Sequence, residues 1–246
     1  MRSLEPVRAL ALADLMLWIS ELLAPPRRDC GTPAVSRSSA SDLGELLQHA
    51  RLSDQGWTSA RLLPIDALLG TPRLAEEKSR LFDGDVICPA DECSYVRRDK
   101  GVLLADIAGF QRAFGFRLSE FSTEKADHIS AELALAALLL VMEVRARSPE
   151  TAAVTRDAWI EFASDHLGEW LLDFAMRLAA TTRLPELAEL AELLECVWQT
   201  ALATMGATPL AGALRGDGEE SGGEDQFAPE DSGTPYECGM IPDPKR

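Results

Sequence analysis

Apolar residues recur at helical spacing along most of the chain. In the N-terminal segment they include Leu12, Met16, Ile19 and Leu23, which share one face of a helix with a period of 3.6 residues. No stretch alternates apolar and polar residues between hairpin turns as a half-buried strand would. The pattern predicts helices over residues 4–23, 41–51, 58–69, 71–82, 99–116, 122–147, 148–181 and 184–205. It therefore predicts an all-α fold, a single helical-bundle domain.

Residues suited to capping mark several of the predicted helix starts. Thr71 followed by Pro72, and Ser148 followed by Pro149, combine an N-cap side chain with proline at the first helical position. The pair at 41–42, Ser-Asp, is expected to cap a short helix in the same way.

The central segment, residues 124–147 (EKADHISAELALAALLLVMEVRAR), opens with acids and a histidine and continues with apolar turns. We expect Ser122 or Thr123 to cap it, which places Glu124 and Asp127 in its first turn, where carboxylates complement the helix dipole. His128 is then free to bond a loop carbonyl or carboxylate. The most apolar run has about ten residues, whereas a bilayer-crossing helix needs about 20, so we expect this helix to be buried in protein.

A second acid–histidine pair, Asp165-His166, lies inside the next predicted helix in the sequence ASDHLGEWLLDF. Adjacent residues on a helix do not face each other, so neither this pair nor Asp127-His128 is a preformed proton relay. We interpret His166 as a histidine packed at the rim of the core.

The composition changes near residue 207, after which glycine, proline and acidic residues dominate. Such a segment has too little apolar surface to fold alone. We therefore divide the chain into a helical domain, residues 1–206, and an acidic tail that is expected to be disordered, residues 207–246.

The formal net charge of −16 argues against nucleic-acid binding, which needs clustered Lys and Arg. It suits a basic partner such as an arginine-bearing peptide, although acidic charge also simply keeps a protein soluble. Charged residues interrupt the apolar N-terminal segment and no cleavage site follows it, so no secretory signal is expected. We expect a cytoplasmic protein without stable membrane insertion.

Five cysteines at irregular spacing do not form a disulfide framework and fit a reducing compartment. Cys88 and Cys93, in the sequence CPADEC, lie at the loose end of zinc-ligand spacing. A metal clip made by these two and Cys238 is a minor possibility that the sequence leaves open.

Catalytic motifs are absent from the sequence: there is no Gly-x-Ser-x-Gly elbow and no phosphate-binding glycine-rich loop. The alternative to a binding protein is a metal-dependent helical-bundle enzyme that uses His128, His166 and nearby carboxylates. Di-iron bundles use Glu-x-x-His motifs, and this chain has Glu-x-x-x-His at Glu124 instead. We therefore expect no catalytic residues, no metal and no cofactor.

Three stretches in order resemble the TorD/DmsD family of redox-enzyme maturation chaperones, which is related to the nitrate reductase delta subunit. They are LADIAGFQRAFGF (104–116), EKADHISAELALAALLLVME (124–143) and DAWIEFASDHLGEWLLDFAMRL (157–178). Gln111 stands where an aromatic residue is common in this family, and Lys125 stands where proline is usual. CPADECSY (88–95) is similar to the loop that precedes these stretches.

The resemblance implies an all-helical cytoplasmic chaperone, not an enzyme. Such proteins bind the apo catalytic subunit of a molybdopterin-dependent oxidoreductase, often through its twin-arginine leader, and assist cofactor insertion before export. Monomers and dimers both fit the resemblance. The client-binding residues expected on this basis, with an acidic rim beside an apolar groove, are Glu124, Asp127, His128, Glu132, Phe110 and His166.

Overall fold

The computed structural model describes residues 5–25, 39–83, 86–116 and 125–207, and every regular element within these ranges is a helix. The predicted all-α fold is therefore confirmed. The helices are α1 (Pro6–Leu23), α2 (Ala40–His49), α3 (Ser59–Asp66), α4 (Pro72–Phe82), α5 (Lys100–Ala113), α6 (Ile129–Val144), α7 (Pro149–Phe162), α8 (Gly168–Thr181) and α9 (Pro185–Met205). Short 3-10 turns lie at Ser53–Gln55 and Glu92–Ser94, and a π-helical turn lies at Ala163–Leu167.

Side-chain caps begin several helices where the sequence predicts them. The Thr71 side chain accepts the Leu74 N–H at the start of α4, and the Ser148 side chain accepts the Thr151 N–H at the start of α7. For α2 the predicted cap is wrong by two residues. Ser39 caps this helix and exchanges hydrogen bonds with Asp42, because an acid three positions after serine completes a capping box.

The predicted helix over residues 148–181 is divided by the π-helical turn at Ala163–Leu167. Gly168 follows this turn, and a Cβ atom on Gly168 would lie 2.3 Å from the carbonyl oxygen of Ala163. Only glycine fits so close an approach of the backbone. Periodicity alone predicts a continuous helix here because the change of pitch spans a single turn.

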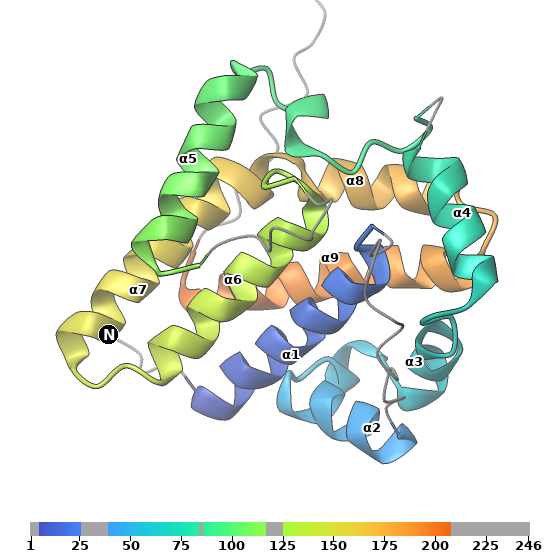
Figure 1. Cartoon of the computed structure of the whole chain (residues 1–246). Helices are drawn as coiled ribbons and strands as arrows, with labels where there is room; N and C mark the ends of the chain where they lie inside the picture. The colour runs from blue at the N-terminus through green and yellow to red at the C-terminus, as the bar shows by residue number, and fades with distance from the viewer. Residues whose placement is uncertain (1–4, 26–38, 84–85, 117–124, 208–246) are drawn as a thin grey trace, which may run out of the picture. The chain divides into compact units, whose positions relative to one another are not determined.

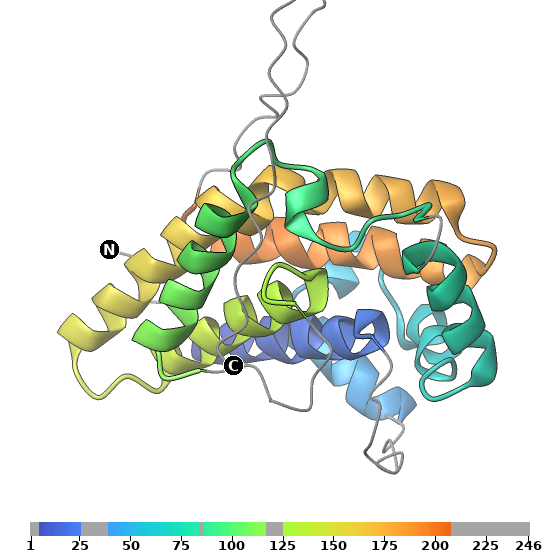
Figure 2. The ribbon, with the colours of Figure 1, turned by 45° about the horizontal axis from the view of Figure 1, so that its top comes forward.

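Two central helices, α1 and α6, pack along each other, and α1 crosses α9 (Figure 1). Figure 2 shows α8 running beside α9, which it contacts, while α7 packs against α6. Ten residues of α1 and eleven each of α6 and α9 are buried. A helix that buries residues on most of its faces belongs at the centre of a bundle.

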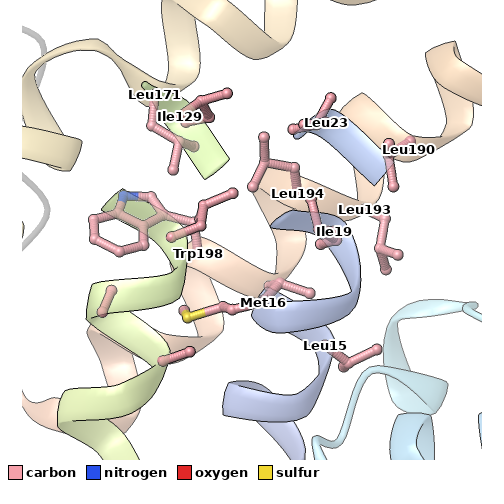
Figure 3. Packing of buried hydrophobic residues seen from close by; sticks show 14 of the residues in the cluster. Leu15, Met16, Ile19, Leu23, Ile129, Leu171, Leu190, Leu193, Leu194 and Trp198 are labelled. Carbon is pink, nitrogen blue, oxygen red and sulfur yellow. The ribbon is translucent and has the colours of Figure 1, made fainter. Parts of the chain in front are cut away.

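The core is formed where α1, α6, α8 and α9 meet. In Figure 3, Ile19 and Leu23 of α1 lie next to Leu194 and Leu190 of α9, and Leu171 of α8 lies beside Ile129 at the start of α6. Trp159, Trp170 and Trp198 are all buried within the same apolar cluster. Burying an aromatic or leucine side chain stabilises the fold by about 1.5–3 kcal/mol.

Within the described residues, none of the helices combines the length and apolar character needed to cross a bilayer. The acidic tail predicted for residues 207–246 lies outside the described residues apart from Ala207. The division of the chain at residue 206 therefore stays a prediction.

Candidate functional site

Two motifs that lie far apart in the sequence are hydrogen-bonded to each other through their backbones. The Ile129 N–H donates to the Ala90 carbonyl over 2.8 Å, and the Glu92 N–H donates to the Asp127 carbonyl over 2.8 Å. Asp91 and His128 lie opposite each other as an isolated antiparallel bridge. The CPADEC loop is thus fixed against the start of α6.

This pairing places the start of α6 later than the sequence predicts. His128, in an extended conformation, is the N-cap, and its Nδ1 accepts the Ser130 N–H over 3.2 Å. The expectation that Ser122 or Thr123 caps this helix, with Asp127 in its first turn, is wrong. The reason is that residues paired to a neighbouring extended segment cannot adopt helical backbone angles. Glu124 lies outside the described residues.

Beneath this pairing lies a cluster of polar side chains with no exposed surface: Glu92, Asp127, Glu132 and His166. Glu92 Oε2 is 3.0 Å from His166 Nδ1, and Trp170 Nε1 donates to Glu132 Oε2 over 3.2 Å. Burial, and after it the neighbouring Glu92 carboxyl, raises the pKa of Glu132 well above its usual value. A proton on Glu132 reduces the repulsion among carboxyl groups that share a dry site.

The Asp127 carboxyl group is buried in this cluster. It lies near Cys93, whose thiol pKa is raised first by burial and then by the Asp127 carboxylate. Asp127 and Glu132 therefore do not form the exposed acidic rim that the sequence predicts. Their part in client binding stays a prediction.

His166 is wholly buried rather than at the rim of the core, which corrects the interpretation made from the sequence. Its ring centroid lies 5.0 Å from that of Phe162 and 5.8 Å from that of Phe110. Phe110 is half-buried and packs edge-on against Phe162. The predicted proximity of Phe110 to the acid–histidine motifs is thus found, but as packing around His166.

An open groove of about 390 Å³ lies beside the pairing of residues 90–92 with 127–129. Helix α4 lines it with Ala75, Lys78, Ser79 and Phe82, whose spacing puts them on one helical face. The lining is completed by Pro25, Asp83, Val86, Pro89, Ala90, Asp91, Ser94, Lys125 and His128. Of the predicted client-binding residues that the structure describes, His128 is the one in this lining.

The groove combines apolar and charged groups. Lys125 forms an ion pair with Asp91, while Lys78 Nζ donates to the carbonyl oxygens of Leu22, over 3.2 Å, and of Ala24. Burial lowers the pKa of Lys78 to about 8, and the nearby Glu21 opposes this shift.

Lys78, Phe82 and Asp91 were not predicted as site residues from the sequence. Both α4 and the loop that contains Asp91 carry a sequence pattern that could have indicated the site. Lys78 and Phe82 are four apart on an amphipathic helix, and Asp91 lies in the CPADECSY loop that resembles the family's own loop.

Metal chemistry finds no support among the described residues, where no group of three or more His, Cys, Asp or Glu side chains is arranged to hold a metal ion. Burial raises the pKa of the Cys88 thiol to about 11. Cys238, the third residue of the postulated clip, lies outside the described residues.

The fold and the groove together define an all-α protein with a groove of mixed polarity and no recognisable catalytic centre among the residues described. A family model described as "Nitrate reductase delta subunit" matches residues 42–176, more than half of the chain. The chain belongs to this family of molybdoenzyme-maturation chaperones, which is not a family of enzymes. Among curated proteins no sequence matches the chain.

Proposed function

We propose that this chain is a chaperone that binds the apo catalytic subunit of a molybdopterin-dependent oxidoreductase. The contact is the subunit's twin-arginine leader, held in the groove between α4 and residues 86–94. The chaperone keeps the subunit available for cofactor insertion and delays its export. The observation that carries this proposal is the convergence of Asp91 and His128 with Phe82 and Pro89 in a single groove.

The chemistry of a twin-arginine leader matches this groove. Such a leader joins guanidinium groups to an apolar stretch, so its receptor needs carboxylates next to apolar surface. Asp83 and Asp91 supply carboxylates, and Phe82, Val86 and Pro89 supply apolar surface. The net charge of −16 also favours capture of a basic segment, because long-range attraction raises the rate of association.

The buried cluster has a supporting part in this proposal. Glu92 follows Asp91 directly in the sequence, and its side chain contacts the buried His166. This contact therefore holds in place the groove-lining segment that contains Asp91. We accordingly assign His166 and Glu132 to positioning of the groove and His128 to its lining. This assignment replaces the direct client contacts predicted for His166 and Glu132.

Titration calorimetry with a synthetic peptide tests the site. The peptide carries two adjacent arginines followed by an apolar stretch. We expect Asp91→Asn to weaken binding by about tenfold or more, since losing a charged hydrogen-bond partner costs about 1.5–3 kcal/mol. Asp157→Asn is the matched control, because Asp157 is exposed on α7 and does not line the groove. Equal affinities of the two folded variants would remove the groove assignment.

Capture of the client tests the function separately from the site. The tagged full chain is used to isolate partners from its native cells, and mass spectrometry identifies them. Enrichment of a molybdopterin oxidoreductase catalytic subunit supports the proposal. Repeating the capture with that subunit lacking its leader decides whether the leader carries the contact. If the leaderless subunit is retained equally well, the main contact is to the body of the enzyme.

A further inference from the structure

Two of the three lysines in the described residues line the groove, and each occupies a position built to accept a cation. Lys125 lies against the Asp91 carboxylate. Lys78 lies against the carbonyl groups at the end of α1. The third, Lys100, begins α5 and is not part of the lining.

The contact between Lys125 and Asp91 is easily exchanged. The Lys125 side chain is 55% exposed, whereas that of Asp91 is 19% exposed. The lysine therefore keeps most of its hydration while it covers a more buried acceptor. Ion pairs with a solvent-exposed partner contribute little to stability, so releasing Lys125 to water costs the fold little.

The position of Lys78 is a cation site made of carbonyl groups. The last carbonyls of a helix have no partner within the helix and carry the negative end of its dipole. Lys78 Nζ bonds two such oxygens, from Leu22 and Ala24, and has no carboxylate within hydrogen-bond distance in the described part of the chain. Burial without a paired carboxylate makes the ammonium costly to hold there, and its lowered pKa agrees with this.

We propose that, in the free protein, Lys78 and Lys125 occupy the positions that two cationic side chains of the client take when it binds. A basic segment of the client displaces both lysines and takes over the Asp91 carboxylate and the carbonyls of Leu22 and Ala24. This inference rests on the proposed function and adds to it the way in which the groove selects its ligand.

Guanidinium groups are suited to this exchange. Arginine is more weakly hydrated than lysine and binds a carboxylate through two parallel hydrogen bonds. A displaced lysine regains full hydration, and no acceptor in the groove is left unpaired. A ligand with a single cation leaves one lysine in place, so the lysines favour ligands that carry two.

The test compares the affinity of the twin-arginine peptide for the full-length wild type and for Lys78→Met, Lys125→Met and the double variant. We expect Lys125→Met to bind between about 1.5-fold and fivefold more tightly, which corresponds to the usual range for an exposed ion pair. Lys78→Met should also bind more tightly than the wild type. A peptide with both arginines replaced by glutamine should show no such gain. Lys100→Met changes the net charge equally and controls for long-range attraction.

Unchanged or weaker binding by variants whose circular dichroism matches the wild type would overturn the inference. The proposed function would then stand as long as the wild type binds the peptide. Binding by the double variant but not by the wild type supports the inference in its strongest form. Failure of both to bind contradicts the inference and the leader-binding proposal together.

Discussion

Glu92 and His166 are 74 positions apart in the chain, yet Glu92 Oε2 and His166 Nδ1 lie 3.0 Å from each other with neither side chain exposed. Glu92 belongs to a 3-10 turn in the segment that lines the groove, and His166 belongs to the π-helical turn between α7 and α8. The contact thus joins the surface groove to the core of the bundle. A hydrogen bond depends on direction, so this contact fixes the position of the loop that contains Glu92 more tightly than apolar packing alone would.

Breaking this contact from one side should be costly. We expect His166→Leu to lower the free energy of unfolding by about 3–5 kcal/mol, because it leaves the Glu92 carboxyl buried without its partner. The double variant Glu92→Leu with His166→Leu should lose less free energy of unfolding than the sum of the losses of the two single variants. Urea unfolding followed by circular dichroism measures all four proteins. Strictly additive losses would show that the two side chains do not interact.

Replacing Glu132 with glutamine should change how stability depends on pH. The folded state keeps a proton on Glu132 at pH values where the unfolded chain, with a usual value near 4.5, loses it. The free energy of unfolding therefore falls as pH rises above about 4.5 until the raised pKa is passed. Glutamine is neutral in both the folded and the unfolded state. The stability of Glu132→Gln relative to the wild type should therefore increase as pH rises.

Unfolding experiments between pH 5 and 8 would measure this difference. Glu195→Gln, an exposed position on α9, should follow the wild type across the range. A constant difference between Glu132→Gln and the wild type would mean that Glu132 is ionised in the folded protein throughout.

Two glycines offer a matched pair of alanine substitutions with opposite expected signs. Gly168→Ala places a Cβ atom 2.3 Å from the Ala163 carbonyl oxygen, and such overpacking costs about 1–3 kcal/mol. Gly109→Ala, in the middle of α5, meets nothing within 4 Å and should stabilise the protein by about 0.5–1 kcal/mol. Thermal unfolding measures both. A neutral Gly168→Ala would show that the π-helical turn rearranges without cost.

The affinity of the groove for the twin-arginine peptide should rise between pH 7 and 9. Burial lowers the pKa of Lys78 to about 8, whereas arginine stays charged, so we expect competition from Lys78 to weaken over this range while the charge of the ligand does not change. Lys78→Met should show a flatter profile over this range. The other titratable groups beside this position are Glu21, Asp83, Asp91, Lys125 and His128. Parallel profiles for the two proteins would contradict a role of Lys78 in the pH dependence.

Local features of the sequence were sufficient for much of the fold. Helix starts at Thr71 and Ser148 followed from cap chemistry that acts within four residues. The apolar residues of α1 predicted a helix, those of α6 predicted a buried helix, and both helices are central. Three ordered motifs resembled a family to which the chain belongs. These inferences succeeded because each depends on neighbouring residues or on a repeated period.

Tertiary structure alone decided which polar groups meet. No period in the sequence relates Glu92 to His166, or Lys78 to the carbonyl groups of Leu22 and Ala24. The start of α6 at Ile129 also has a distant cause, because Ala90 and Glu92 hold residues 127–129 extended. The sequence by itself determined the helices and the family. The burial of Asp127, Glu132 and His166 and the place of the groove depend on contacts between distant segments, which form only when the helices pack.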